Sequence, residues 1–215
     1  MSTHCCHGPH STPEDRQRDA RYRRVLWAVL GINAVMFCIE IVAGLAAGSV
    51  SLQADALDFL ADAGNYGLSL FVVGRAGHYR ARAAFAKGAT MGLFGLWVLG
   101  ATVWHTMHGV LPQAVTMGAV GFAALVANAG VFGMLWAYRS GDSNMRSVWL
   151  CSRNDVIGNL AVLLATLGVF GTGTAWPDIS VAVVMAVLAL QGAMHVMRQS
   201  IAELRHPPLA TGAAR

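Results

Sequence analysis

Six long apolar stretches, separated by short polar segments, dominate the sequence. A helix needs about 20 apolar residues to cross a bilayer, and each stretch is of that order. We predict six transmembrane helices, over residues 25–46, 50–72, 88–108, 115–138, 147–171 and 177–199. The joints carry turn-forming residues, such as GTGTAWPD at 171–178. The pattern predicts an all-α membrane protein with a six-helix transmembrane bundle at residues 24–204, an N-terminal tail at 1–23 and a short disordered tail at 205–215.

The charges support a membrane location and predict an orientation. Only 12% of the 215 residues are charged and 55% are hydrophobic, whereas soluble domains carry about twice that charged fraction. Lys and Arg lie before the first predicted helix, after the last, and in the second and fourth connections, with Lys87 in the second. The first, third and fifth connections have none. Basic residues favour the cytoplasmic side, so we expect both termini in the cytoplasm. This topology accounts for the net charge of +4, and we expect no nucleic-acid partner.

Two polar stripes interrupt the apolar helices. Asp55, Asp58, Asp62 and Asn65 recur at helical spacing on the second predicted helix and share one face. The second stripe lies on the fifth predicted helix, where Cys151, Asp155 and Asn159 also recur at helical spacing. Acidic side chains at membrane depth are costly and mark candidate functional sites.

The two stripes can converge on a metal ion. The second and fifth helices run in opposite directions, so contact between them sets Asp58 level with Asp155 and Asp62 level with Cys151. Three carboxylates and one thiolate make a four-coordinate site for a divalent transition metal. Zn²⁺ fits best and Cd²⁺ fits well, while iron, cobalt and nickel stay open. Ca²⁺ and Mg²⁺ are disfavoured, because they prefer six or more oxygen ligands. Packing as a small buried hydrophobe is the alternative for Cys151.

The stretch GSVSLQADALDFLAD and the paired ligand-type residues of the two stripes resemble the cation diffusion facilitator family, in a form that lacks the C-terminal cytoplasmic domain. The resemblance implies a tetrahedral site that carries a divalent metal, usually zinc, in exchange for protons. It places Asp58, Asp62 and Asp155 at ligand positions, and Cys151 where the family usually has His or Asp. It further implies a homodimeric secondary transporter rather than an enzyme. We expect the protein in the inner membrane of a bacterium.

The ligand chemistry itself couples metal to protons. Three carboxylates and a thiolate cannot all stay ionised when they are close together and empty, so the empty site is expected to hold protons. A divalent cation displaces those protons, because metal ligands must be deprotonated. Two other functions stay open: a membrane metal sensor that binds without transporting, and, less favoured, an intramembrane aspartyl hydrolase built on paired acids. No prosthetic group is predicted.

Further polar residues are secondary candidates. Asp55 is expected to line the outward path or to orient a ligand from behind. Glu40 is expected to be a hydrogen-bond partner between helices, with a proton relay or a place on the path as the alternative. Asn65 and Asn159 continue the two stripes. The N-terminal tail offers borderline and soft metal ligands at His4, Cys5, Cys6, His7 and His10. Their spacing matches no structural zinc motif, so the tail is either a metal-capturing arm or an incidental composition.

Overall fold

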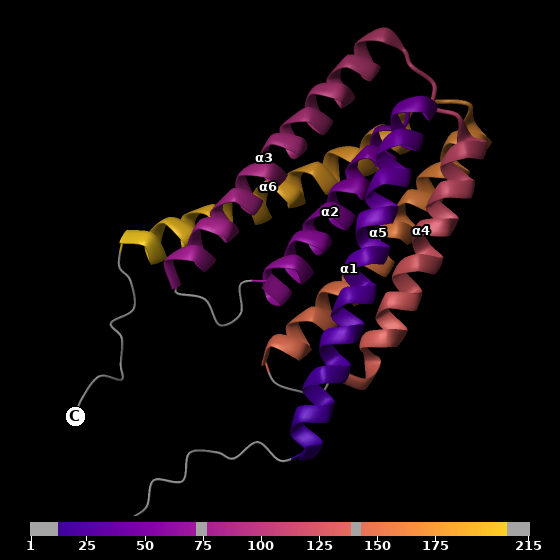
Figure 1. The fold of residues 1–215 in the computed structure, drawn as a ribbon. Helices are drawn as coiled ribbons and strands as arrows, with labels where there is room; N and C mark the ends of the chain where they lie inside the picture. The colour runs from indigo at the N-terminus through magenta and orange to yellow at the C-terminus, as the bar shows by residue number, and fades with distance from the viewer. Residues whose placement is uncertain (1–12, 72–76, 139–142, 206–215) are drawn as a thin grey trace, which may run out of the picture.

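The computed structural model describes the backbone of residues 13–71, 77–138 and 143–205, and the side chains of 21–68, 70, 79, 81–137 and 155–205. All of the described regular structure is helical. The helices are α1 (Pro13–Ala47), α2 (Val50–Phe71), α3 (Gly77–His108), α4 (Ala114–Leu135) with a 3-10 turn η1 (Trp136–Tyr138), α5 (Ser143–Thr172) and α6 (Trp176–Arg205). They form one elongated bundle (Figure 1). The predicted membrane helical bundle is therefore confirmed.

Five of the helices are long and apolar enough to cross a membrane by themselves. The qualifying segments are Arg21–Ala47, Ala81–His108, Ala114–Leu135, Asp155–Thr172 and Trp176–Arg205. The α2 helix is as long as α4, at 22 residues, but its three aspartates keep it outside that group. Neighbouring helices surround α2 and keep its aspartates away from lipid, as its packing shows.

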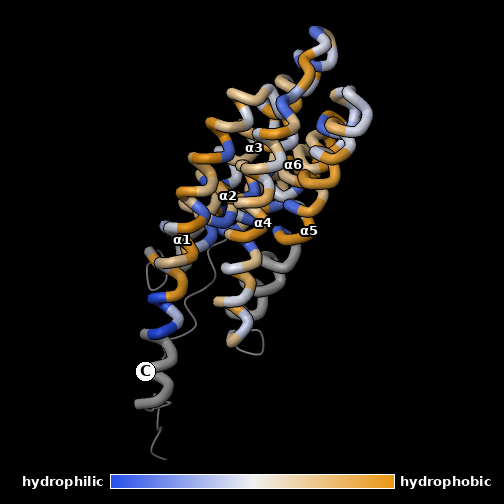
Figure 2. The backbone as a smooth tube through the Cα atoms, turned by 90° about the vertical axis from the view of Figure 1, so that its right-hand side faces the viewer, coloured by the Kyte–Doolittle hydropathy of each residue, from blue (hydrophilic) through white to orange (hydrophobic). Residues whose placement is uncertain are grey.

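The α2 helix is the most enclosed element of the bundle. It packs against α1, α3, α5 and α6, and every residue from Val50 to Leu57 is buried. Hydrophilic stretches of the chain accordingly lie within the bundle near α2 (Figure 2). An acidic helix can occupy membrane depth when neighbouring helices separate it from lipid, and this arrangement provides that separation.

Three tight turns gather at one end of the bundle. The turns follow α1, α3 and α5, and each contains a glycine in the left-handed region, at Gly48, Gly109 and Gly173. The amide of Gln113, in the turn before α4, donates a hydrogen bond of 2.9 Å to the carbonyl of Ala47 at the end of α1. None of these three turns contains Lys or Arg, and Figure 1 shows them near one another at the upper end of the bundle.

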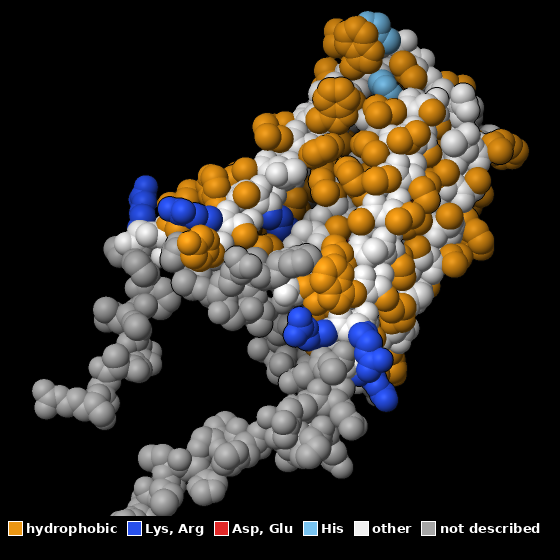
Figure 3. Space-filling model, viewed as in Figure 1, with side chains coloured by type: hydrophobic (Ala, Val, Ile, Leu, Met, Phe, Trp, Pro, Cys, Tyr) orange, Lys and Arg blue, Asp and Glu red, His pale blue; other side chains and the backbone are white. Residues whose placement is uncertain are grey.

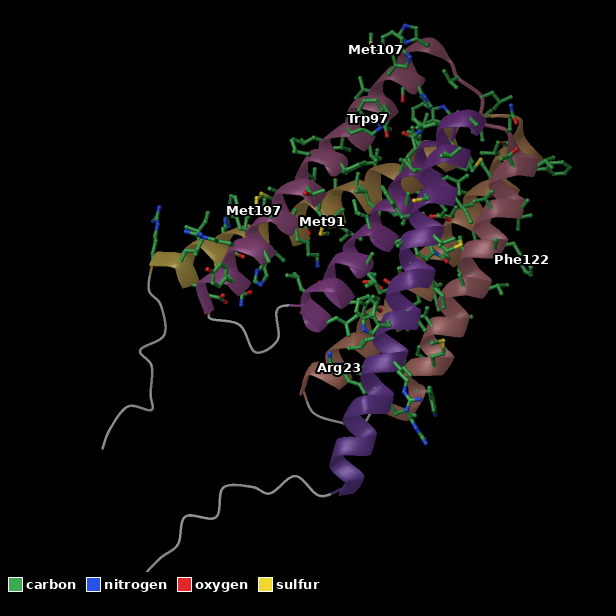
Figure 4. The ribbon with its side chains drawn as sticks, in the orientation of Figure 1. Arg23, Met91, Trp97, Met107, Phe122 and Met197 are labelled. Atoms are coloured by element: carbon green, nitrogen blue, oxygen red, sulfur yellow. The ribbon has the colours of Figure 1, made fainter. Side chains whose placement is uncertain are left out.

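Close backbone contact joins α3 to α6. A Cβ at Gly88 would lie 2.9 Å from the Cγ of Met197 and 3.2 Å from the carbonyl oxygen of Ala193. Only a residue without a side chain allows that approach, which is the usual device at helix interfaces in membranes. Figure 4 labels Met197 at this contact between the two helices.

The described surface is apolar along the bundle and basic at one end. Figure 3 shows hydrophobic side chains over the length of the helices, and Lys or Arg side chains at the end away from the tight turns. Arg21, Arg23 and Arg24 of α1 are exposed there, as are Arg82 of α3 and Arg198 of α6. The α1 helix begins at Pro13, ahead of the predicted span, and so includes the basic segment that precedes the apolar run.

Candidate functional site

The site lies where α2 meets α5. The Nδ2 of Asn159 on α5 donates to both carboxylate oxygens of Asp55 on α2, at 2.9 and 3.0 Å. Further along, the carboxyl groups of Asp62 and Asp155 interact directly. Residue numbers rise along α2 while they fall along α5, so the two helices are antiparallel, as the topology predicted. The register differs from the prediction, because Asp155 interacts directly with Asp62, whereas we expected it level with Asp58. The two polar stripes face each other.

Three carboxyl groups come together at this interface: Asp58 and Asp62 of α2 and Asp155 of α5, here called the acid cluster. Asp58 lies within electrostatic range of Asp62, and Asp155 within range of both. A Cβ built on Gly158 would lie 3.8 Å from the Oδ2 of Asp58. The Asp58 carboxylate thus lies close to α5 at Gly158.

Few donors serve the acid cluster. The hydroxyl of Tyr66 donates to the Oδ2 of Asp62 at 3.1 Å. The Oδ2 of Asp155 is buried and has no hydrogen-bond partner. A buried acceptor without a donor is costly, and either a proton or a bound cation removes that cost. The cluster therefore has the chemistry of a cation site.

The fourth predicted ligand, Cys151, lies on α5 one helical turn before Asp155, and its side chain is outside the described residues. Among the side chains that are described, no three His, Cys, Asp or Glu residues form a metal-binding group. The three described carboxyl groups of the acid cluster therefore do not form such a group by themselves, and a coordination shell that also includes Cys151 stays a prediction. His4, Cys5, Cys6, His7 and His10 also lie outside the described residues.

A buried polar chain runs outward from the acid cluster toward the tight turns. The Nδ2 of Asn128 on α4 donates to the Oδ1 of Asn159 at 3.2 Å, and Asn159 in turn donates to Asp55. Glu40 of α1 interacts with Asp55 from the other side. The sequence predicted roles for Glu40, Asp55 and Asn159 near the site. It missed Asn128, because a single asparagine in an apolar helix gives no signal of its partner.

The position of Lys87 differs from the topology that we predicted from the sequence. We predicted it in the connection before the third helix, but it lies inside α3 and is half-buried. Its Nζ donates to the Oδ1 of Asn65, its alkyl chain crosses Gly64, and its charge acts on Asp62. The α3 helix starts at Gly77, well before the apolar run that we used to place it. One basic residue therefore stands beside the acid cluster.

Comparison with known proteins decides the family. Residues 26–205 match the cation efflux transmembrane domain, which is most of the chain. The protein belongs to the cation efflux family. The resemblance to cation diffusion facilitators is thereby confirmed, and the chain is an integral membrane protein.

Relatives in this family are described as metal transporters. The zinc transporter ZitB of Yersinia pestis is 26% identical over 211 residues, covering 87% of this chain and 64% of that protein. The zinc transporter ZitB of Escherichia coli K12 is 27% identical over 214 residues, covering 92% and 67%. A cadmium, cobalt and zinc/H(+)-K(+) antiporter of Bacillus velezensis is 23% identical over 179 residues, covering 76% and 56%. The chain spans about two thirds or less of the length of these relatives, and none of their names describes an enzyme.

Proposed function

We propose that this protein exports divalent transition-metal cations from the cytoplasm in exchange for protons, with Zn²⁺ as the main substrate and Cd²⁺ as a second one. The cation would bind between α2 and α5, held by Asp58, Asp62, Cys151 and Asp155. The observation that supports this most directly is the acid cluster, in which carboxyl groups of two antiparallel helices meet inside the bundle.

The donor set favours a borderline or soft ion. Carboxylates alone would suit Mg²⁺ or Ca²⁺, but a thiolate from Cys151 would favour Zn²⁺ or Cd²⁺. The names of the relatives, which include zinc, cadmium and cobalt, agree with this choice. The cation is substrate here, so its ligands must also release it, and the half-buried state of Asp58 and Asp155 is consistent with a site that opens.

Proton coupling follows from the same ligands. Like charges at short distance repel, and the repulsion is relieved either by protons or by a divalent cation. A site exposed alternately to the two sides of the membrane would then carry protons one way and metal the other. The membrane potential adds about 2.3 kcal/mol per net charge moved for each 100 mV.

The test uses purified protein in liposomes with a zinc-sensitive dye inside. An imposed pH gradient should drive Zn²⁺ uptake, and collapsing the gradient should abolish it. Asp58→Ala and Asp155→Ala should lose uptake and Zn²⁺ binding, the latter measured by calorimetry. Glu203→Ala is the matched control, because Glu203 is an exposed acidic residue of α6 and should transport like the wild type.

The outcomes separate the candidate functions. Binding that depends on Asp58 and Asp155 without any uptake would identify a metal sensor and refute transport. Wild-type binding and uptake in both variants would place the site elsewhere. We also expect a homodimer in a bacterial inner membrane, which mass measurement in detergent and membrane fractionation would check.

A further inference from the structure

Glu40 is a buried carboxyl group that faces the carboxyl group of Asp55. It lies on α1, it is fully buried, and neither of its carboxyl oxygens has a hydrogen-bond partner. The α1 helix packs against α2 and α4. An ionised carboxylate in such a position would be very costly without a positive partner.

The neighbours of Glu40 are acidic or uncharged. The carboxyl groups of Asp55 and Asp58 on α2 lie within electrostatic range of Glu40. Asp155 of α5 lies in turn within electrostatic range of Asp55. The α4 helix contains no ionisable residue. The half-buried Lys87 is on α3 and acts on Asp62, toward the other end of the acid cluster. Among the described groups that act on Glu40, none is basic, so a proton is the cation that can neutralise it.

The hydrogen bonds around Asp55 show which carboxyl group holds that proton. The amide Nδ2 of Asn159 donates to both oxygens of Asp55. Asn128 donates to the Oδ1 of Asn159, which fixes the orientation of that amide. Asp55 is therefore held as an acceptor, and the proton of the pair belongs on Glu40.

Structural carboxylates in this chain look different from Glu40. Asp178 of α6 is also buried, but its two oxygens accept three hydrogen bonds from the start of α2. Such a group is locked in place by its donors. The oxygens of Glu40 accept no such bonds, and its neighbour across the α1–α2 contact is the carboxyl group of Asp55. Its proton would exchange with water only if that contact opened.

A cavity borders the α1–α2 contact. It has a volume of about 500 Å³ and is lined by Leu45 of α1, Gln53 of α2, and Trp97 and Trp104 of α3, among others. Gln53 also packs against α1, because a Cβ on Gly44 would lie only 3.0 Å from the Cγ of Gln53. Gly44 is one helical turn from Glu40 on the same face of α1. The two helices are therefore in close contact next to Glu40.

We propose that Glu40 binds and releases one proton of the transport cycle, at a site on the α1–α2 contact that is separate from the metal ligands. The inference rests on the proposed exchange of metal for protons. Glu40 takes a proton from water when the α1–α2 contact opens and returns it to water on the other half of the cycle. It does not touch the cation, and Asp55 stays the acceptor that faces it.

Infrared spectroscopy tests the protonation of Glu40 without any transport. At pH 7 the wild-type protein should show the carbonyl stretch of a protonated carboxyl group, and that intensity should fall in E40Q but not in E203Q, which changes an exposed glutamate. If E40Q does not fold, carboxyl-¹³C-labelled glutamate in the wild type should shift part of the same band. An unchanged band in E40Q, or no isotope shift in the wild type, would overturn the assignment.

Transport then tests its role. E40Q should bind Zn²⁺ within about threefold of the wild type, but lose about tenfold or more of the uptake driven by a pH gradient. Full gradient-driven uptake in E40Q, with the wild type active, would overturn the inference alone and leave the proposed exporter intact. A wild type whose Zn²⁺ uptake ignores the gradient would overturn both, since no proton cycle would exist.

Discussion

Replacing Asp178 by alanine should destabilise the bundle more than any other change at the end with the tight turns. Asp178 belongs to the first turn of α6 but completes the start of α2. Its Oδ1 accepts hydrogen bonds from the hydroxyl of Ser49 at 2.7 Å and the amide of Ser51 at 3.0 Å. Its Oδ2 accepts one from the amide of Val50 at 2.9 Å. The first amides of a helix have no partner within the helix, so the alanine variant leaves them unpaired.

The magnitude follows from these bonds. A hydrogen bond to a charged group contributes about 1.5 to 3 kcal/mol, and a negative charge at a helix N-terminus adds up to about 2 kcal/mol in a partly buried position. Removal of the buried charge recovers part of this as desolvation energy. We expect a net loss of about 3 to 5 kcal/mol in the free energy of unfolding. Asp178→Asn keeps one acceptor oxygen and should lose about half as much.

The assay is equilibrium unfolding by SDS in mixed micelles, followed by tryptophan fluorescence. Ser180→Ala is the control, because Ser180 is exposed two residues further along α6 and its hydroxyl donates to the carbonyl of Trp176 in its own helix. It should stay within about 0.5 kcal/mol of the wild type. If Asp178→Ala is as stable as Ser180→Ala, the reasoning that α6 completes the start of α2 is wrong.

Three further predictions concern the helix contacts and the site. Gly88→Val should lower the free energy of unfolding by about 1 to 3 kcal/mol in the same assay, since its side chain would collide with α6, whereas Gly100→Ala, with open space around it, should not. Lys87→Met should tighten Zn²⁺ binding by about 3- to 10-fold in calorimetry, because it removes a positive charge within electrostatic range of Asp62. Lys87→Arg keeps the charge and should not tighten binding. Unchanged affinity in Lys87→Met would refute the effect. Cys151→Ser should abolish the sulfur-to-metal charge-transfer absorption of the Co²⁺-loaded protein, and a wild type without that band would exclude the thiolate as a ligand.

The faces of the helices could be read from the sequence alone. Helical spacing placed Asp55, Asp58 and Asp62 on one side of α2, and the alternating direction of the spans predicted that α2 and α5 would be antiparallel if they touched. These conclusions need only the periodicity of a helix and the length of a membrane span. They were available because the cost of acids in lipid leaves few arrangements open.

The partners across helices were decided by the tertiary structure. Asp178 looked like a turn residue, yet its bonds reach Ser49 and its neighbours, 129 positions away in the chain. Asn128 and Lys87 gave no sequence signal either, because periodicity says which face a residue occupies but not which helix that face meets. An apolar run also marks only the part of a helix inside lipid, so Lys87 was placed in a connection. The packing of α1 and α2 around Glu40 was decided the same way, by which small residues allow two backbones to approach.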